Sequence, residues 1–144
     1  MPDIVHDIPI SSDIESSFEC VATSEGLSKW WSIGGTGQPG VGNTFTFDFG
    51  PEYQWEAIVR EFELNSVFSI QMTVADDDWT GTTVRFVLEP RDEGIMLRFE
   101  HRGWPHDNEH YRTSSYCWAM YLRCMKNYLE KGVFLPYEKR FTGE

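Results

Sequence analysis

The feature that most limits the possible folds is a change in the spacing of apolar residues at about residue 104. Before it, side chains alternate between two faces, and the more apolar face carries Ile95, Leu97, Phe99 and His101. After it, apolar residues recur at helical spacing over 107–131, where Asp107 or Asn108 can cap the start and Gly132 can end the helix. The spacing therefore predicts a strand with one buried face that leads into a single long amphipathic helix.

Alternating runs upstream predict the rest of an antiparallel sheet, because each is bounded by turn-forming residues. The expected strands are 3–10, 45–49, 53–64, 67–74, 79–90 and 95–104. The alternation in the third of these breaks near Ile58 and Val59, which indicates a β-bulge. Asp76, Asp77 and Asp78 are expected to form a turn, because the spacing of a calcium-binding loop is missing from this stretch of sequence.

Two short helices are expected between the first and second strands. Ser11 or Ser12 can cap the first helix, and Glu15 stands three residues after Ser12, as in a capping box. A second helical piece is expected over 24–32. The next segment, 34–42, contains five glycines and a proline, which predicts an irregular loop without a regular element.

Together these elements predict an α+β domain. A curved antiparallel sheet of about six strands would wrap around the long C-terminal helix, with two short helices after the first strand. The apolar face of the sheet must be buried, and the long helix is the expected element large enough to cover it. Because ligands commonly occupy such a gap, a cavity is expected between the sheet and the helix. A length of 144 residues suits one domain, 1–144.

Charge and cysteine content narrow the expected partners and compartment. The formal net charge is −11, so nucleic acid and membrane surfaces are not expected as partners. Cys20, Cys117 and Cys124 are odd in number and form no paired metal-binding motif, which favours free thiols. The sequence shows neither a signal peptide nor a long apolar stretch, so we expect a cytoplasmic protein, as a monomer or a homodimer.

Four motifs follow one another along the chain: L-S-K-W-W ending at Trp31, G-N-T-F-T-F, H-R-G-W ending at Trp104, and Y-C-W-A-M-Y-L-R-C-M-K-N-Y-L-E-K-G ending at Gly132. Their order and spacing resemble the START-like (Bet v 1-like, SRPBCC) superfamily, and within it the group named for the activator of Hsp90 ATPase. The resemblance covers nearly the whole chain and implies the helix-grip fold. It leaves function open, because the superfamily includes lipid carriers, hormone receptors, aromatases and co-chaperone domains.

Three of the four histidines fall between residues 101 and 110, which raises the question of a metal site. Zinc needs three or four converging ligands. His106 and His110 could share one helix face, but the alternation points His101 into the sheet interior, and nearby acidic residues suit a helix N-terminus. We therefore expect no metal and no other cofactor.

His101 has two interpretations, a core histidine satisfied by a hydrogen bond or a polar anchor for a ligand. Acid–base catalysis would need a second inward-facing acid beside it, and the sequence offers none at a defined spacing. No catalytic residue is therefore assigned, and a binding protein is expected more than an enzyme.

The residues expected to line the cavity are mostly large aromatic or apolar side chains, which could also form an ordinary core. They are Trp30, Trp31, Trp55, Phe68, Met72, Phe86, Phe99, His101, Trp104, Trp118, Tyr121, Leu122 and Met125. The function expected first is binding of an apolar, aromatic or lipidic small molecule. The alternatives are a co-chaperone-type contact with an Hsp90-like ATPase, which the resemblance implies, and a polyketide cyclase-like or aromatase-like enzyme.

Overall fold

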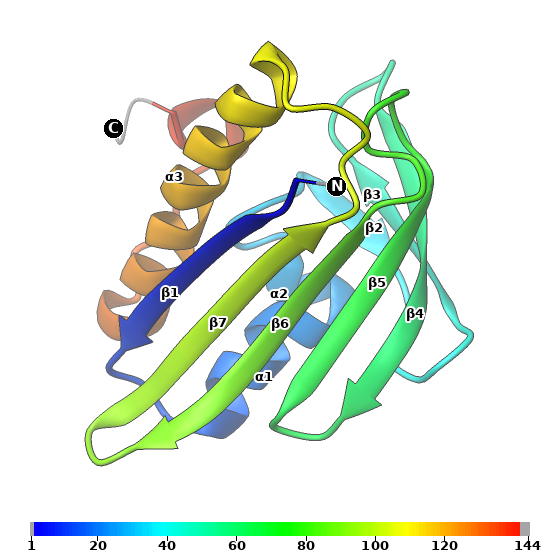
Figure 1. Cartoon of the computed structure of the whole chain (residues 1–144). Helices are drawn as coiled ribbons and strands as arrows, with labels where there is room; N and C mark the ends of the chain where they lie inside the picture. Colours follow the sequence, from blue (N-terminus) through cyan, green and yellow to red (C-terminus); the bar gives the residue numbers. More distant parts are fainter. Residues whose placement is uncertain (1, 142–144) are drawn as a thin grey trace.

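In a computed structural model that describes residues 2–141, a curved antiparallel sheet lies against one long helix (Figure 1). The elements in chain order are β1 (Ile4–Ile10), α1 (Ile14–Ala22), α2 (Ser24–Leu27), β2 (Gly34–Thr36), β3 (Thr44–Asp48), β4 (Gln54–Glu63), β5 (Val67–Val74), β6 (Thr83–Arg91), β7 (Gly94–Arg102), α3 (Glu109–Lys131) and a 3-10 turn (Tyr137–Lys139). The predicted α+β helix-grip fold is confirmed, with seven strands in the described residues where about six were expected.

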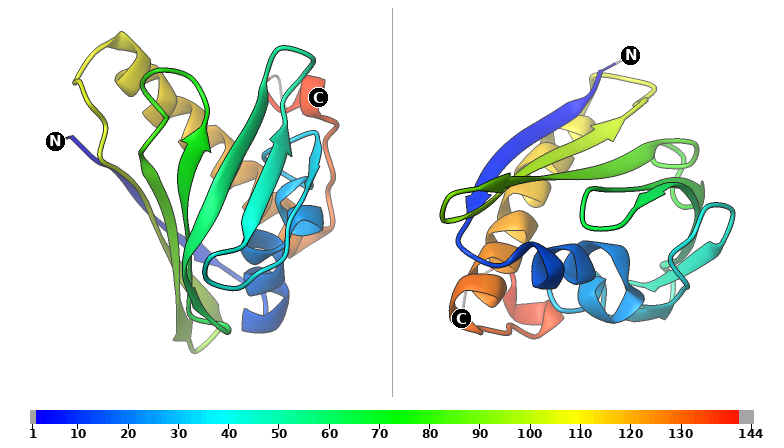
Figure 2. Two further views of the ribbon diagram at one scale, coloured as in Figure 1. Left: turned by 90° about the vertical axis from the view of Figure 1, so that its right-hand side faces the viewer. Right: turned by 90° about the horizontal axis from the view of Figure 1, so that it is seen from below.

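The strand order across the sheet is β1-β7-β6-β5-β4-β3-β2. The first strand therefore joins the last one, and every neighbouring pair is antiparallel. The helices α1 and α2 lie on the same side of the sheet as α3 (Figure 2). The predicted bulge in β4 is confirmed by a shift of register between Val59 and Glu61.

The glycine-rich segment contains a short strand that the sequence prediction missed. β2 pairs with β3, so that Gly35 lies opposite Phe47 and Thr36 lies opposite Thr46. Gly35 has a φ of +156°, and a Cβ atom there would collide with the carbonyl oxygen of Thr46. The prediction of an irregular loop was wrong here because glycine allows this close approach of two backbones.

The N-terminus of α1 also differs from its prediction. Asp13 is the N-cap, and its Oδ1 accepts a hydrogen bond from the backbone N–H of Ser16 at 2.7 Å. Ser11, a predicted cap, instead donates its backbone N–H to Glu130 of α3 at 2.8 Å. The predicted capping box was wrong because a carboxylate closer to the helix satisfies the free N–H and suits the positive end of the helix dipole.

The predicted bounds of two further elements, the second helix and the strand expected over 79–90, differ from the structure. α2 covers Ser24–Leu27 and not the full 24–32, with its last carbonyls accepting from the turn that follows. β6 begins at Thr83, so Trp79 belongs to the preceding turn and not to the strand. The long helix agrees with its prediction: Asn108 caps the start by accepting from Tyr111 N–H, and Gly132 ends it in the left-handed conformation at φ +69°.

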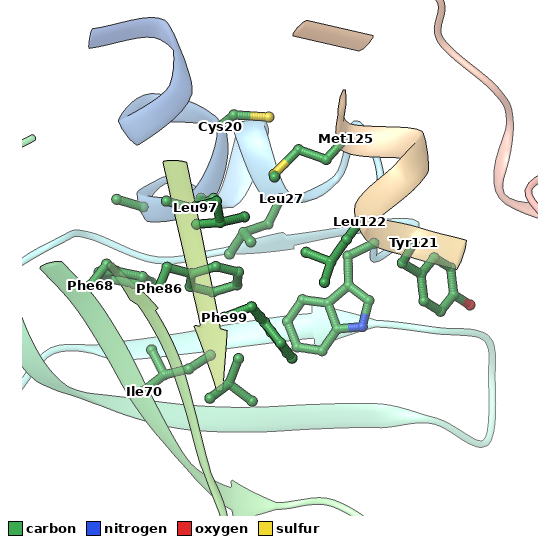
Figure 3. Close-up of a cluster of buried hydrophobic side chains, with 14 of the residues drawn as sticks. Cys20, Leu27, Phe68, Ile70, Phe86, Leu97, Phe99, Tyr121, Leu122 and Met125 are labelled. Atoms are coloured by element: carbon green, nitrogen blue, oxygen red, sulfur yellow. The ribbon is translucent and has the colours of Figure 1, made fainter. Parts of the chain in front are cut away.

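The core lies between the sheet and the helices. Phe86 and Phe99 from the sheet point toward Leu122 and Met125 of α3 (Figure 3). Each of these four side chains is at most 1% exposed. None of the helices in residues 2–141 combines the length and apolar character required to cross a membrane.

Candidate functional site: an aromatic pocket over a buried histidine

A pocket of about 290 Å³ opens at the end of the sheet where the turn between β5 and β6 meets α3 and the C-terminal segment. Seven of its eight lining residues are aromatic. The eight are Trp31, Phe49, Tyr53, Trp55, Asp76, Trp79, Tyr121 and Tyr137. This composition makes the pocket a surface of ring faces and edges with one acidic group.

Four of the lining rings form a closed circuit of contacts. Ring centroids lie 5.3 Å apart for Trp31 and Phe49, and 5.2 Å apart for Phe49 and Trp55. Trp55 lies 5.1 Å from Trp79, which in turn lies 6.4 Å from Trp31. These distances are within the range in which aromatic pairs attract one another, so the four rings support each other's orientation.

A tight turn directs Trp79 inward. Asp76 Oδ1 accepts hydrogen bonds from the backbone N–H groups of Asp78 at 3.0 Å and Trp79 at 2.8 Å. Gly81 follows with a φ of +92°, which favours glycine. The predicted turn at the three aspartates is therefore confirmed, and its consequence is that the Trp79 side chain is only 8% exposed.

The acidic group of the pocket is Asp76, whose two carboxylate oxygens have different partners. While Oδ1 holds the turn, Oδ2 lies 2.9 Å from Nε2 of His110 on α3. The Asp76 side chain is 38% exposed, so its charge stays in contact with solvent at the pocket.

Behind the pocket, His101 is fully buried at the end of β7, as its alternation predicted. The indole N–H of Trp118 donates to His101 Nδ1 at 3.0 Å. His101 Nε2 lies 2.7 Å from Thr82 Oγ1, which donates to the carbonyl oxygen of Trp79 at 2.5 Å. A chain of three hydrogen bonds thus connects α3 to the backbone of the pocket residue Trp79.

These partners determine the state of the His101 ring. An indole N–H can only donate, so Nδ1 must accept, and the proton of the neutral ring lies on Nε2 and points to Thr82. Burial, with a smaller effect from His110, lowers the pKa of His101 to about 3. Both ring nitrogens are therefore occupied by side chains, and the ring is neutral at pH 7.

The C-terminal segment provides one wall of the pocket. Tyr137 contacts Phe49 at a centroid distance of 6.4 Å. Arg140 is 3% exposed and donates to the carbonyl oxygens of Leu135, Ser32 and Ser28 at 2.9–3.1 Å. The bonds to Ser28 and Ser32 attach the C-terminal segment to the chain after α2, and the bond to Leu135 braces the segment itself, so together they keep Tyr137 in place.

The structure divides the thirteen predicted cavity residues into two groups. Three of them, Trp31, Trp55 and Tyr121, line the pocket. The other ten lie in the packed interior or at its edge: Trp30, Phe68, Met72, Phe86, Phe99, His101, Trp104, Trp118, Leu122 and Met125, each at most 1% exposed. A ligand-binding role for those ten remains a prediction.

Five of the lining residues were not predicted from the sequence to line a cavity, namely Phe49, Tyr53, Asp76, Trp79 and Tyr137. Phe49 continues the alternation of Phe45 and Phe47, so the end of an aromatic stripe was an available signal. A tryptophan three residues after a turn-forming aspartate was another, because a large ring in a turn needs a place to be buried.

The other histidines of the predicted cluster lie apart from the His101 hydrogen bonds. His106 is exposed, and His110 binds Asp76. Asp107 pairs with Arg112 near the start of α3. Within residues 2–141, no three histidine, cysteine or acidic side chains are grouped so that they could hold a metal ion.

Comparison with solved structures gives several similar folds. The Aha1 dimer from Colwellia psychrerythraea is 28% identical, with a TM-score of 0.82 over 92% of this chain and 98% of that chain. A Staphylococcus saprophyticus protein is 18% identical, with a TM-score of 0.78 over 93% of this chain and 96% of that one. CalU16 from Micromonospora echinospora is 15% identical, with a TM-score of 0.75 over 98% of this chain and 81% of that one.

At 18% and 15% identity, the second and third similarities show a shared fold only. Comparison with curated proteins gives no significant match. The model of the family described as activator of Hsp90 ATPase homolog 1-like protein matches residues 12–130, which include α1 through most of α3. The chain therefore belongs to the activator of Hsp90 ATPase homolog 1-like family.

Proposed function

We propose that this protein binds a small apolar or aromatic molecule in the pocket around Trp31, Trp55 and Trp79. The observation that carries the proposal is the lining itself, in which seven of eight residues are aromatic. Binding pockets are typically apolar surfaces with a few placed polar groups, and here Asp76 supplies such a group. The family's helix-grip fold supports a ligand-binding domain in general.

The pocket suits a small ligand. Its volume of about 290 Å³ is just below the usual range for small-molecule sites, roughly 300–1,000 Å³. Trp55 and Phe49 are half-buried, and Tyr53 is 54% exposed. A ligand would therefore cover ring surface that water now contacts, and this burial would favour binding.

The site supports binding better than cyclase-type catalysis. A general base needs a free nitrogen or oxygen within reach of the substrate proton. His101 has both nitrogens engaged, with Trp118 and Thr82, and it is not among the pocket-lining residues. Asp76 is the one carboxylate of the described lining, and the turn and His110 hold it in place, which suits the positioning of a bound ligand.

Native mass spectrometry of the purified protein tests the proposal directly, because a co-purifying small molecule adds its mass to the 16.8 kDa chain. Isothermal titration with the identified molecule then compares two variants. Trp55→Ala should weaken binding, whereas Tyr116→Ala removes an exposed ring on α3 outside the pocket and should not. Equal effects of the two substitutions would contradict the proposed site.

A second candidate is a protein contact of the co-chaperone type, supported by family membership and the 28% identity to the Aha1 dimer. Its test is the turnover of an Hsp90-type ATPase with and without this protein. Stimulation that persists in Trp55→Ala would favour the protein contact over pocket binding. Unchanged turnover over a wide concentration range would contradict this second function.

A further inference from the structure

We propose that the aromatic pocket binds a methylated ammonium group, that is, an organic cation whose charge is surrounded by methyl groups. This inference rests on the proposed function, since it names the class of ligand for the same pocket. It follows from two properties of the lining, the kind of rings it contains and the sign of its charge.

The rings are those that attract organic cations best. A cation over the face of tryptophan, tyrosine or phenylalanine is attracted by the negative charge of the ring face, most strongly by tryptophan. The pocket contains Trp31, Trp55 and Trp79 together with Phe49 and three tyrosines. The tilted and edge-on contacts between neighbouring rings, such as 60° for Trp31 and Phe49, form walls in more than one plane.

The charge of the site has the sign that a cation needs. Asp76 is the only charged group among the described residues that line the pocket, and Asp77 and Asp78 continue the same turn. The whole chain has a formal net charge of −11, which raises the local concentration of cations around it. Because the turn and His110 hold the Asp76 side chain, its charge has a defined position.

A methylated ammonium fits better than a primary one. A primary ammonium has three N–H groups that need acceptors in place of their water shell. Asp76 is the only carboxylate among the described lining residues, and its oxygens already lie within hydrogen-bond distance of the Asp78 and Trp79 N–H groups and of His110 Nε2. A methylated ammonium donates few or no hydrogen bonds and places methyl groups against the rings. Two side-chain cations already lie over rings next to the pocket, the Arg140 guanidinium carbon 5.7 Å from the Tyr137 ring centre and Lys29 Nζ 5.7 Å from that of Phe134.

Arg140 does not itself occupy the pocket. Its three nitrogens donate to the backbone carbonyls of Leu135, Ser32 and Ser28, and it is not a lining residue. The described lining therefore lacks a basic side chain, and the cation would have to come from the ligand.

The test compares choline with 3,3-dimethylbutan-1-ol, a neutral alcohol of the same shape, by isothermal titration and by NMR of the tryptophan indole N–H signals. We expect choline to bind at least about tenfold more tightly than the alcohol, because only choline gains the cation–ring and carboxylate attraction. Phosphatidylcholine vesicles form a parallel arm that distinguishes a lipid headgroup from a free molecule. Binding in either arm that depends on Asp76 supports the proposal.

Two variants and one control assign the effect. Asp76→Asn keeps an oxygen that can accept from the Asp78 and Trp79 N–H groups but removes the charge, and should weaken choline binding about five- to tenfold. Trp55→Leu keeps an apolar wall but removes a ring, and should weaken choline about fivefold while leaving the alcohol nearly unchanged. Asp92→Asn neutralises an exposed carboxylate in the turn between β6 and β7 and should change neither.

The outcomes separate this inference from the proposed function. Tighter binding of the alcohol than of choline, or equal loss of both ligands in Asp76→Asn, would overturn the cation preference and leave a pocket for neutral molecules. A protein that binds neither probe in either arm and carries no co-purifying molecule would overturn both. Thermal unfolding of each variant is measured first and shows whether the variant is folded. If Asp76→Asn does not fold, the choline and alcohol affinities of Trp55→Leu still test the cation preference.

Discussion

The indole N–H of Trp118 on α3 donates to Nδ1 of His101 on β7 at 3.0 Å, in a region where both side chains are at most 1% exposed. This one bond links the helix to the sheet and fixes which nitrogen of His101 is protonated. A buried polar pair of this kind contributes modestly when intact but is expensive to break on one side.

Replacing Trp118 with phenylalanine should show how much stability is lost when this buried hydrogen bond is broken on one side. The variant leaves His101 Nδ1 without its donor, and we expect the free energy of unfolding to fall by about 2–4 kcal/mol, the sum of an unpaired buried acceptor and lost ring contacts. Chemical denaturation measures it. Trp104→Phe is the matched control, because the Trp104 indole N–H is buried with no hydrogen-bond partner in the described structure. An equal loss in the two variants would mean that the Trp118 bond contributes little.

The neutral, buried His101 should make stability depend on pH. Its pKa is lowered from 6.5 to about 3 in the folded protein, so between these values the unfolded chain binds the proton that the folded chain excludes. Stability is therefore lost as the pH falls below about 6.5, by about 2 kcal/mol from this group between pH 7 and pH 5.

Denaturation of the wild type and of His101→Gln at both pH values isolates this contribution. Glutamine keeps a donor and an acceptor but does not titrate, so the variant should lose about 2 kcal/mol less than the wild type on acidification. His106→Gln, at an exposed site, should behave as the wild type. Identical pH slopes for wild type and His101→Gln would contradict a buried neutral imidazole.

Thr82 should be intolerant of losing its hydroxyl. That oxygen lies between His101 Nε2 and the Trp79 carbonyl oxygen, so Thr82→Val leaves the buried N–H of His101 Nε2 without its acceptor, while the Trp79 carbonyl keeps the backbone N–H of Thr82 as a partner at 2.9 Å. We expect the free energy of unfolding of Thr82→Val to fall by about 1–3 kcal/mol, whereas Thr82→Ser, which retains the hydroxyl, should lose about 1 kcal/mol or less. The denaturant midpoints of the two variants measure this difference. A valine variant as stable as the serine variant would contradict a stabilising role for the Thr82 hydroxyl.

The C-terminal wall of the pocket should depend on Arg140. Arg140→Met keeps much of the side-chain volume but removes the donors to Leu135, Ser32 and Ser28. We expect faster amide hydrogen exchange in residues 133–141 with little change in the central strands, because the loss is local. Arg123→Met, at an exposed position of α3, is the control and should leave exchange in this segment unchanged.

Thiol labelling should distinguish the three cysteines. Burial raises the pKa of Cys20 to about 12, and its side chain is 3% exposed, so it should react only after unfolding. Cys117 and Cys124 are half-buried, with pKa values raised by burial, and should react slowly in the native protein. Mass spectrometry of alkylated peptides identifies the sites, and rapid labelling of native Cys20 would contradict its burial.

Features set by local periodicity were predictable from the sequence. The alternation from Ile95 placed His101 inside, and the helical spacing with Asn108 and Gly132 placed α3 closely. Features set by contacts between distant segments were not. The pairing of β2 depends on Gly35 lying against Thr46, and the position of Tyr137 in the pocket depends on Arg140 bonds to residues more than 100 positions away.

The six tryptophans form one connected set of rings, since Trp79 contacts Trp31, Trp55, Trp104 and Trp118, and Trp30 contacts Trp31 and Trp118. Their electronic transitions must therefore couple, and the near-ultraviolet circular dichroism of this protein will be a collective exciton signal. Excitation energy absorbed by any of these indoles can transfer to the others before emission. A ligand that touches only the partly exposed Trp55 would then change the circular dichroism and fluorescence contributed by all six tryptophans.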